Sequence, residues 1–201
     1  MTEENGIQAY PLYIRGDLSS PPNRGLWLIK WILAIPHFLV LFFLTIASFV
    51  VWFIAWWAIL FTARYPRWMF NYIVGVMRWT WRVSFYAGVL GTDRYPPFSL
   101  ASNDDYPADI TVVYPERLSR LKVVFKFWLL AIPQYIVTYF FGGLGFALSI
   151  FAGIALLFTG RYRSDMFGAQ MALNRWKWRV TGYISFLYDD YPPYEFDTRT
   201  G

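Results

Sequence analysis

The sequence predicts an all-α membrane protein made of two tandem helical hairpins, with four transmembrane helices in total. The first observation is the composition: 57% of the 201 residues are hydrophobic and 22% are aromatic, a richer apolar content than an ordinary soluble domain has. The second is a pair of long stretches with almost no ionisable side chains. The third is that the second half of the chain repeats the first. Together they favour one membrane-bound unit used twice.

The repeat appears when the chain is slid along itself. Four motifs recur with an offset of 97 (128 − 31 = 97) or, after one deletion, of 96 (189 − 93 = 96). The matched segments are Trp31–Pro36 with Trp128–Pro133, Leu60–Tyr65 with Leu157–Tyr162, Arg78–Val83 with Arg175–Val180, and Asp93–Phe98 with Asp189–Tyr194. We therefore expect modules over 26–99 and 108–196, joined by a linker over 100–107. Residues 1–25 form an N-terminal segment and 197–201 a tail.

The motifs resemble a known family. Leu-Phe-Thr-Gly-Arg-Tyr, then Arg-Trp, Arg-Val and Tyr-Pro-Pro with an aromatic residue, are similar to the module of a bacterial membrane family called domain of unknown function 4389. The resemblance covers both halves. The second copy departs from it at Arg163, where the first copy has Pro66 and family modules have proline. The resemblance implies a bacterial membrane protein and carries no activity with it.

Each module begins with a long uncharged stretch. From residue 26 to residue 63, the only ionisable side chains are Lys30 and His37. One helix of these 38 residues would be roughly 57 Å long, whereas a hydrocarbon core is about 30 Å thick. We therefore predict two spans joined by a turn, placed in the second module at Gly142, Gly143 and Gly145.

The hairpins also predict an orientation. Every Lys and Arg lies outside 31–63 and 127–160, so the positive-inside rule predicts that both termini and the linker are cytoplasmic. The modules would then be related by a pseudo-twofold axis along the membrane normal. Residues 1–25 lack the features of a signal peptide, and the expected location is the bacterial cytoplasmic (inner) membrane.

A basic, aromatic segment follows each hairpin. In the first copy, Phe70, Ile73, Met77 and Trp81 form an apolar stripe at helical spacing, opposite a polar stripe that contains Arg78 and Arg82. We expect an interfacial amphipathic helix with the aromatic residues toward acyl chains. The alternative is a third span per module. In the second copy Gln170 and Asn174 replace Ile73 and Met77, so packing on protein remains an alternative there.

Several side chains are candidates for specific roles. The candidates for lipid headgroup binding are Arg64, Arg78, Arg82, Arg161, Arg175, Lys177 and Arg179. Those for helix packing are Trp52 and Trp56, which we expect to fill a groove over Gly145, Ser149 and Gly153. His37 and its repeat mate Gln134 are intramembrane polar groups, expected to form interhelical hydrogen bonds or to contact a proton or a headgroup.

The sequence predicts no catalytic site and no cofactor or metal site. It has no Cys and one His, which excludes thiol nucleophiles, thiolate metal sites and iron–sulfur clusters. It also lacks a glycine-rich phosphate loop, a zinc helix motif and a nucleophile elbow. The aspartates near the module exits are expected to be solvated loop charges: Asp93, Asp104, Asp105, Asp109, Asp189 and Asp190.

Three functions remain open. The first is a noncatalytic structural or accessory subunit of a membrane complex, whose partners are membrane lipids and a membrane protein or a second copy of the chain. The alternatives are an anionic-lipid-binding or lipid-transfer module and an oligomeric channel or transporter component. The net charge is +5, but its basic residues abut the predicted spans, so topology explains them and a nucleic-acid partner is not expected.

Overall fold

The computed structural model describes residues 10–18, 22–126 and 132–192. Each half has the same order of elements, which are a strand, a short helix, a long helix and a helix of 21 residues. The first half has β1 (Leu12–Gly16), α1 (Trp27–Leu33), α2 (Ile35–Thr62) and α3 (Arg67–Ala87). The second has β2 (Ala108–Val112), α4 (Arg120–Phe125), α5 (Ile132–Thr159) and α6 (Ser164–Ile184).

The predicted hairpin inside each uncharged stretch is wrong. Helices α2 and α5 each run unbroken for 28 residues, so each is about 42 Å long. Gly142, Gly143 and Gly145 all lie within α5. Glycine permits a turn without requiring one, and its cost of about 1 kcal/mol in a helix is small beside the loss of a run of backbone hydrogen bonds in an apolar setting. The described residues thus contain two helices long and apolar enough to cross a membrane, and they do not show the four predicted spans.

This correction removes the basis of the predicted orientation. Basic residues stand at both ends of each long helix, because Lys30 precedes α2 and Arg64 follows it, while Lys126 precedes α5 and Arg161 follows it. If α2 or α5 crosses a bilayer, its cations lie on both sides. The positive-inside argument required the chain to turn back within each uncharged stretch, so that all basic residues lay on one side of the membrane.

The chain turns back after the long helices, at the Leu-Phe-Thr motif. Thr62 and Thr159 each donate to the carbonyl four residues earlier, at 2.7 and 2.6 Å, and each accepts from the amide two residues later, at 3.2 Å. The residues between are left-handed, Ala63 with φ 56° and Gly160 with φ 66°, which is a common way to end a helix. The motif is thus a helix stop.

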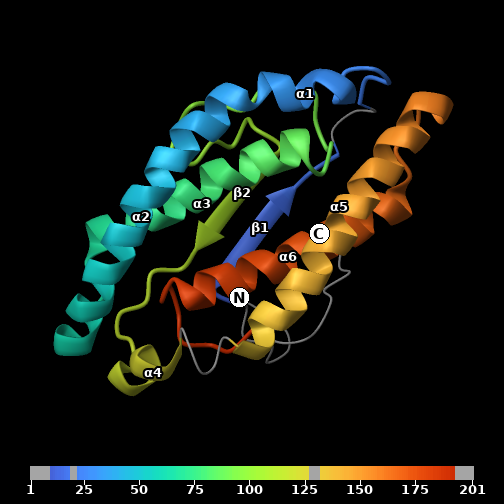
Figure 1. Cartoon of the computed structure of the whole chain (residues 1–201). Helices are drawn as coiled ribbons and strands as arrows, with labels where there is room; N and C mark the ends of the chain where they lie inside the picture. The colour runs from blue at the N-terminus through green and yellow to red at the C-terminus, as the bar shows by residue number, and fades with distance from the viewer. Residues whose placement is uncertain (1–9, 19–21, 127–131, 193–201) are drawn as a thin grey trace, which may run out of the picture.

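A two-stranded antiparallel sheet joins the halves, and the sequence did not indicate it. Ile14 pairs with Ile110, and these residues are 96 apart (110 − 14 = 96), as are the Tyr-Pro pairs that precede the two strands. The strands are therefore repeat mates, and a local twofold axis passes through this central pair. Strand β2 lies on α3 of the first half, and β1 lies on α6 of the second (Figure 1).

The expected interfacial stripe of α3 faces the protein core. Phe70, Ile73, Met77 and Trp81 are all buried in the main hydrophobic cluster with residues of both strands. The Trp81 indole nitrogen donates to the Arg15 carbonyl of β1 at 2.8 Å. The strands cover this face of the helix, so it cannot face acyl chains as predicted.

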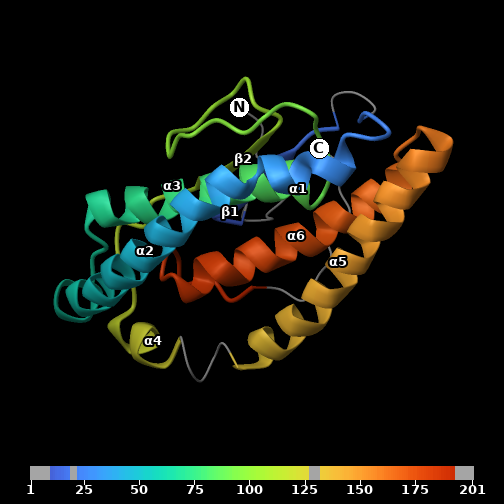
Figure 2. The same ribbon diagram turned by 45° about the horizontal axis from the view of Figure 1, so that its top comes forward.

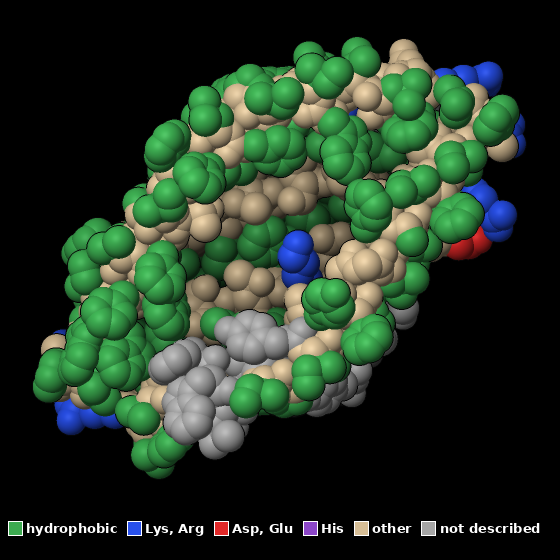
Figure 3. All heavy atoms as spheres, in the orientation of Figure 1, with side chains coloured by type: hydrophobic (Ala, Val, Ile, Leu, Met, Phe, Trp, Pro, Cys, Tyr) green, Lys and Arg blue, Asp and Glu red, His purple; other side chains and the backbone are tan. Residues whose placement is uncertain are grey.

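The long helices lie at the outer edges of the molecule. Both views place α2 and α5 apart, with α3, α6 and the sheet between them (Figures 1 and 2). In the space-filling view, apolar side chains cover both long helices, and the surface is hollowed between them, with a basic side chain in the hollow (Figure 3).

Candidate functional site

Two of the arginines predicted to bind headgroups, Arg78 and Arg82, form hydrogen bonds and ion pairs within the protein. Arg82 is fully buried and donates to the carbonyls of Ser99 and Ala101, at 3.2 and 2.8 Å. Arg82 Nη2 and Arg78 Nε lie 3.2 and 2.8 Å from Asp109 Oδ1. Both guanidinium groups thus contact a carboxylate that β2 brings onto them, and headgroup binding by Arg78 and Arg82 stays a prediction.

Three aspartates predicted to be solvated are in ion pairs. Besides Asp109, Asp93 Oδ1 lies 2.7 Å from Lys30 Nζ, and Asp189 Oδ1 lies 3.0 Å from Lys126 Nζ. Burial lowers the pKa of both lysines, and the paired aspartate opposes that shift in each case. The two pairs are repeat mates that tie the exit of each module to its start. The remaining predicted aspartates are exposed, namely Asp104, Asp105 and Asp190.

His37 and Gln134 are both fully buried at equivalent places. His37 Nδ1 accepts from the Trp79 indole of α3 at 3.0 Å, and its ring stacks on Phe98 at 3.9 Å between centroids. Gln134 Nε2 donates to the Pro192 carbonyl at 3.3 Å. Both residues thus hold the Tyr-Pro-Pro exit of their own module, and His37 also bonds across to a second helix.

The tryptophans of α2 do not pack on the small residues of α5 as predicted. The Trp52 indole donates to the Ile184 carbonyl at 3.0 Å and stacks on Phe186 at 5.2 Å. The Trp56 indole donates to the Val123 carbonyl of α4 at 3.2 Å. Because α2 and α5 lie at opposite edges, Trp52 and Trp56 instead contact the end of α6 and the short helix α4 of the other half.

The small residues of α5 meet large partners from elsewhere. A Cβ at Gly153 would lie 3.0 Å from the Trp27 indole of α1. Trp27 and Val123 correspond by an offset of 96 (123 − 27 = 96), the one that also relates Lys30 to Lys126. Trp56 and Gly153 correspond by the offset of 97 (153 − 56 = 97). A large side chain thus faces a smaller one at both places. At one place the tryptophan is on the long helix α2 and faces Val123, and at the other it is on the short helix α1 and faces Gly153.

Gln170 holds the other two small residues, because its Nε2 donates to the Gly145 carbonyl at 2.9 Å and to Ser149 Oγ at 2.8 Å. This side chain was visible in the sequence as a polar break in the apolar stripe. The structure shows that the break serves the contact of α6 with α5.

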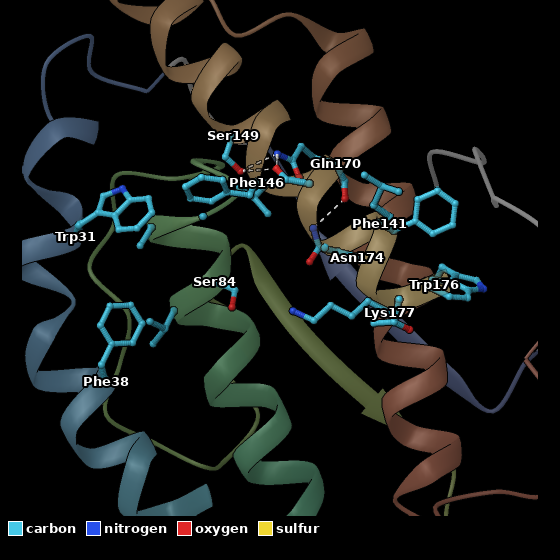
Figure 4. A pocket seen from close by; sticks show the side chains of 18 residues that line it. Trp31, Phe38, Ser84, Phe141, Phe146, Ser149, Gln170, Asn174, Trp176 and Lys177 are labelled. Carbon is cyan, nitrogen blue, oxygen red and sulfur yellow. Dashed lines mark hydrogen bonds between the residues drawn. The ribbon is translucent and has the colours of Figure 1, made fainter. Parts of the chain in front are cut away.

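A pocket of about 250 Å³ lies where the start of α2 and the end of α3 face α5 and α6. Figure 4 shows Trp31, Phe38 and Phe146 as its apolar side, together with the polar side chains of Gln170, Asn174 and Lys177 from α6. The lining thus joins the two modules. It presents apolar and hydrogen-bonding groups to one space.

Lys177 is the ionisable side chain among the described residues that line this pocket. It extends into the space between α6 and α3 (Figure 4). The described residues give its amino group no ion pair or hydrogen bond, and the amino nitrogen lies 5.9 Å from the centre of the Trp178 ring. Although the side chain is solvent-accessible, the protein atoms around the amino group desolvate it and lower the pKa of Lys177.

The other predicted headgroup candidates lie outside the pocket. Arg64 and Arg161 are exposed just beyond the ends of α2 and α5. Arg175 and Arg179 are half-buried on α6, and the Arg179 guanidinium lies 5.1 Å from the Tyr10 ring centre. Of these cations, Lys177 is the one that the described structure aims into a cavity. Within the described ranges no three His, Asp or Glu side chains gather as metal ligands.

Comparison with known proteins agrees with the repeat. Two segments, residues 24–99 and 120–195, match the family model described as domain of unknown function (DUF4389). Among curated proteins and solved structures, nothing matches the chain. The matched segments include both long helices, both 21-residue helices and the pocket between them. The chain therefore belongs to the DUF4389 family and carries two tandem copies of its domain.

Proposed function

We propose that the protein is a noncatalytic membrane subunit, in which α2 and α5 lie in the bilayer while α3, α6 and the sheet form a scaffold between them. The observation that carries the proposal is the bare apolar surface of the long helices. Only 11% of the most apolar 18 residues of α2, and 17% of those of α5, are buried. Soluble monomers rarely expose apolar patches of that extent.

The exposure separates this proposal from two simpler explanations. The core helix of a soluble protein is mostly buried, whereas Phe49 and Phe61 of α2 are 68% and 70% exposed, and Phe140 and Phe158 of α5 are 71% and 79% exposed. A signal sequence accounts for a helix near the N-terminus, but α5 lies in the second half of the chain. A helix of about 42 Å is also long enough for a hydrocarbon core of about 30 Å, with some tilt.

The pairing of buried cations with aspartates inside the protein supports a structural role. The buried cations Lys30, Arg82 and Lys126 are each within 3.2 Å of an aspartate. Such pairs hold the exits and strands in place, since the loss of one partner leaves a buried charge uncompensated. We propose the bacterial cytoplasmic membrane as the location, on the family resemblance, and a membrane protein or a second copy of the chain as the partner.

Membrane fractionation of the full chain tests the first part of the proposal. After an alkaline carbonate wash, the protein is expected in the membrane pellet, released by detergent and not by salt. Recovery in the washed supernatant would refute embedding, since peripheral proteins leave the membrane under these conditions.

The subunit role needs a separate measurement. Native mass spectrometry after mild extraction is expected to give one complex of definite stoichiometry, either with a partner or with further copies of the chain. A lone monomer across detergents contradicts the role. Ion flux above that of empty vesicles, after reconstitution of the purified protein, would instead favour a channel component.

The pocket between the modules favours a second candidate function, an anionic-lipid-binding module. It combines an apolar wall with one basic side chain beside helices that we place in the bilayer. Lipid binding and a subunit role are compatible, because a bound lipid can fill the space between the two modules.

A further inference from the structure

The pocket lies in the second half of the molecule, at a place whose equivalent in the first half is filled by a side chain. In the first half, the Trp52 indole reaches Ile184, the last residue of α6. Their repeat mates are Ser149 and Ala87, the latter being the last residue of α3, and both of these line the pocket. A serine thus stands where an indole would close the space. The pocket results from this difference between the copies.

A second difference supplies the polar groups. Gln170, Asn174 and Lys177 lie at positions i, i+4 and i+7 of α6, which share one face of a helix, and all three line the pocket. Their repeat mates in α3 are Ile73, Met77 and Thr80, of which the first two are core residues of the first module. Four changes between the copies therefore meet at one cavity.

We propose that this pocket binds a lipid with an anionic headgroup, with part of one acyl chain along the apolar wall and the headgroup beside Lys177. The proposal rests on the membrane location proposed above. It assigns the anion to Lys177 because no carboxylate is among the described residues that line the pocket. A cation beside an apolar wall, to which the described residues offer no ion pair, favours an anionic partner.

The size and chemistry of the space agree with this occupant. A volume of about 250 Å³ lies just below the about 300–1,000 Å³ typical of small-molecule sites, so it holds a segment of one chain rather than a whole two-chain lipid. The Gly142 position leaves open space on the α5 side, since an added Cβ there would meet nothing within 4 Å. An anion near Lys177 would also offset the desolvation that lowers the pKa of its amino group.

The test measures probe binding to the purified full chain in a neutral detergent by native mass spectrometry. The probes are oleoyl lysophosphatidylglycerol, oleoyl lysophosphatidylcholine, mono-oleoylglycerol and inorganic phosphate. The anionic lysolipid is expected to bind about tenfold or more tightly than the zwitterionic and uncharged lipids, as a charge-assisted contact provides. Inorganic phosphate is not expected to compete at equal concentration, since it makes no apolar contact.

Lys177→Thr installs the residue of the first copy and is expected to remove the preference for the anionic lipid. Lys177→Arg is expected to retain it. Arg163→Ala, which removes an exposed cation outside the pocket, is the charge control and is expected to bind as the wild type does.

A second pair of variants tests the apolar part. Gly142→Phe fills the pocket and is expected to weaken all three lipids by about tenfold or more. Gly143→Phe is the matched control, because a Cβ there also meets nothing within 4 Å and Gly143 does not line the pocket. It is expected to bind like the wild type, and both variants replace a helical glycine, so their effects on helix stability match.

Equal binding of the three lipids by the wild type overturns the proposal, as does an undiminished anionic preference in Lys177→Thr. Full competition by inorganic phosphate would reassign the site to a free anion. Carbonate washing of the same protein keeps the two proposals separate. An embedded protein without the preference refutes only the lipid site, whereas a protein that washes off the membrane refutes the embedding.

Discussion

The two modules share one fold but differ in how the long helix of each meets the 21-residue helix of the other. In the first half, an aromatic side chain closes the space beside the end of α6, since Trp52 stacks on Phe186. In the second half, Ser149 leaves the equivalent space beside α3 open, and α6 adds Lys177 to it. The first copy thus has a packed interface at this place, and the second has a polar-lined pocket.

The largest expected effect concerns the charges on α3. Asp109→Ala leaves Arg78 and Arg82 without their carboxylate, and removal of one partner from a buried ion pair typically costs about 3–5 kcal/mol. We expect a loss of stability of that order, measured by thermal unfolding in detergent.

The matched control for Asp109 is its repeat mate Tyr13, which is 63% exposed. Tyr13→Ala is expected to change the stability by less than about 0.5 kcal/mol. Equal effects of the two variants would show that the first module does not depend on this ion pair.

The next effect tests the filled interface. Trp52→Ser should open a cavity beside Ile184 and destabilise the protein by about 2 kcal/mol, less than the about 3–5 kcal/mol of a fully buried tryptophan, because Trp52 is only partly buried. Chemical unfolding in mixed micelles measures it. Trp57→Ser, at a position that is 42% exposed on the same helix, is the control, and an equal loss there would contradict the role given to Trp52.

The converse substitution tests the open interface. Ser149→Trp gives the second half the residue of the first, so the indole is expected to occupy the pocket and to weaken binding of oleoyl lysophosphatidylglycerol by about tenfold, or about 1.4 kcal/mol. Isothermal titration in detergent measures the change. Ser149→Ala removes the hydroxyl but not the space, and a loss of similar size in that variant would point to the hydrogen bond with Gln170 instead.

The smallest effect lies at the helix stops. Ala63 has a left-handed φ of 56°, where the second copy has Gly160 at 66°. Ala63→Gly is expected to stabilise the protein by about 0.5–1 kcal/mol. The substitution relieves about 1–2 kcal/mol of backbone strain at the left-handed position, but part of this gain is lost because glycine has more conformational entropy in the unfolded state. Thermal unfolding measures the gain. Ala58→Gly, within α2, should lose about 1 kcal/mol.

Local patterns predicted some features well. The repeat and the two long apolar stretches followed from spacing and composition, and the family followed from the resemblance of the motifs, since these signals are read along the chain. The hairpin turn was wrong because the same uncharged run fits two short helices or one long one, and the glycines near Gly143 permit either. The strands were missed because β1 and β2 pair with each other across some 96 residues, so neither has a hairpin signal nearby.

The candidate site was predicted only as a set of cations. Seven basic residues looked alike, because each follows or flanks an aromatic run. The structure separates them: Asp109 lies beside Arg78 and Arg82, while Lys177 points into the pocket. Gln170 and Asn174 were recognised as breaks in an apolar stripe, and the structure shows that both line the pocket, where Gln170 also bonds Ser149.

The amino-acid sequence by itself determined the duplication, the two long apolar stretches and the places where they end, because backbone propensity and side-chain polarity act over a few residues. Only the tertiary structure decided which half supplies each partner. Both strands and α4 pack on the opposite module, and Trp27 of α1 reaches Gly153 there. The pairing of Asp109 with Arg82 and the pocket beside Lys177 likewise depend on contacts between residues far apart in the chain.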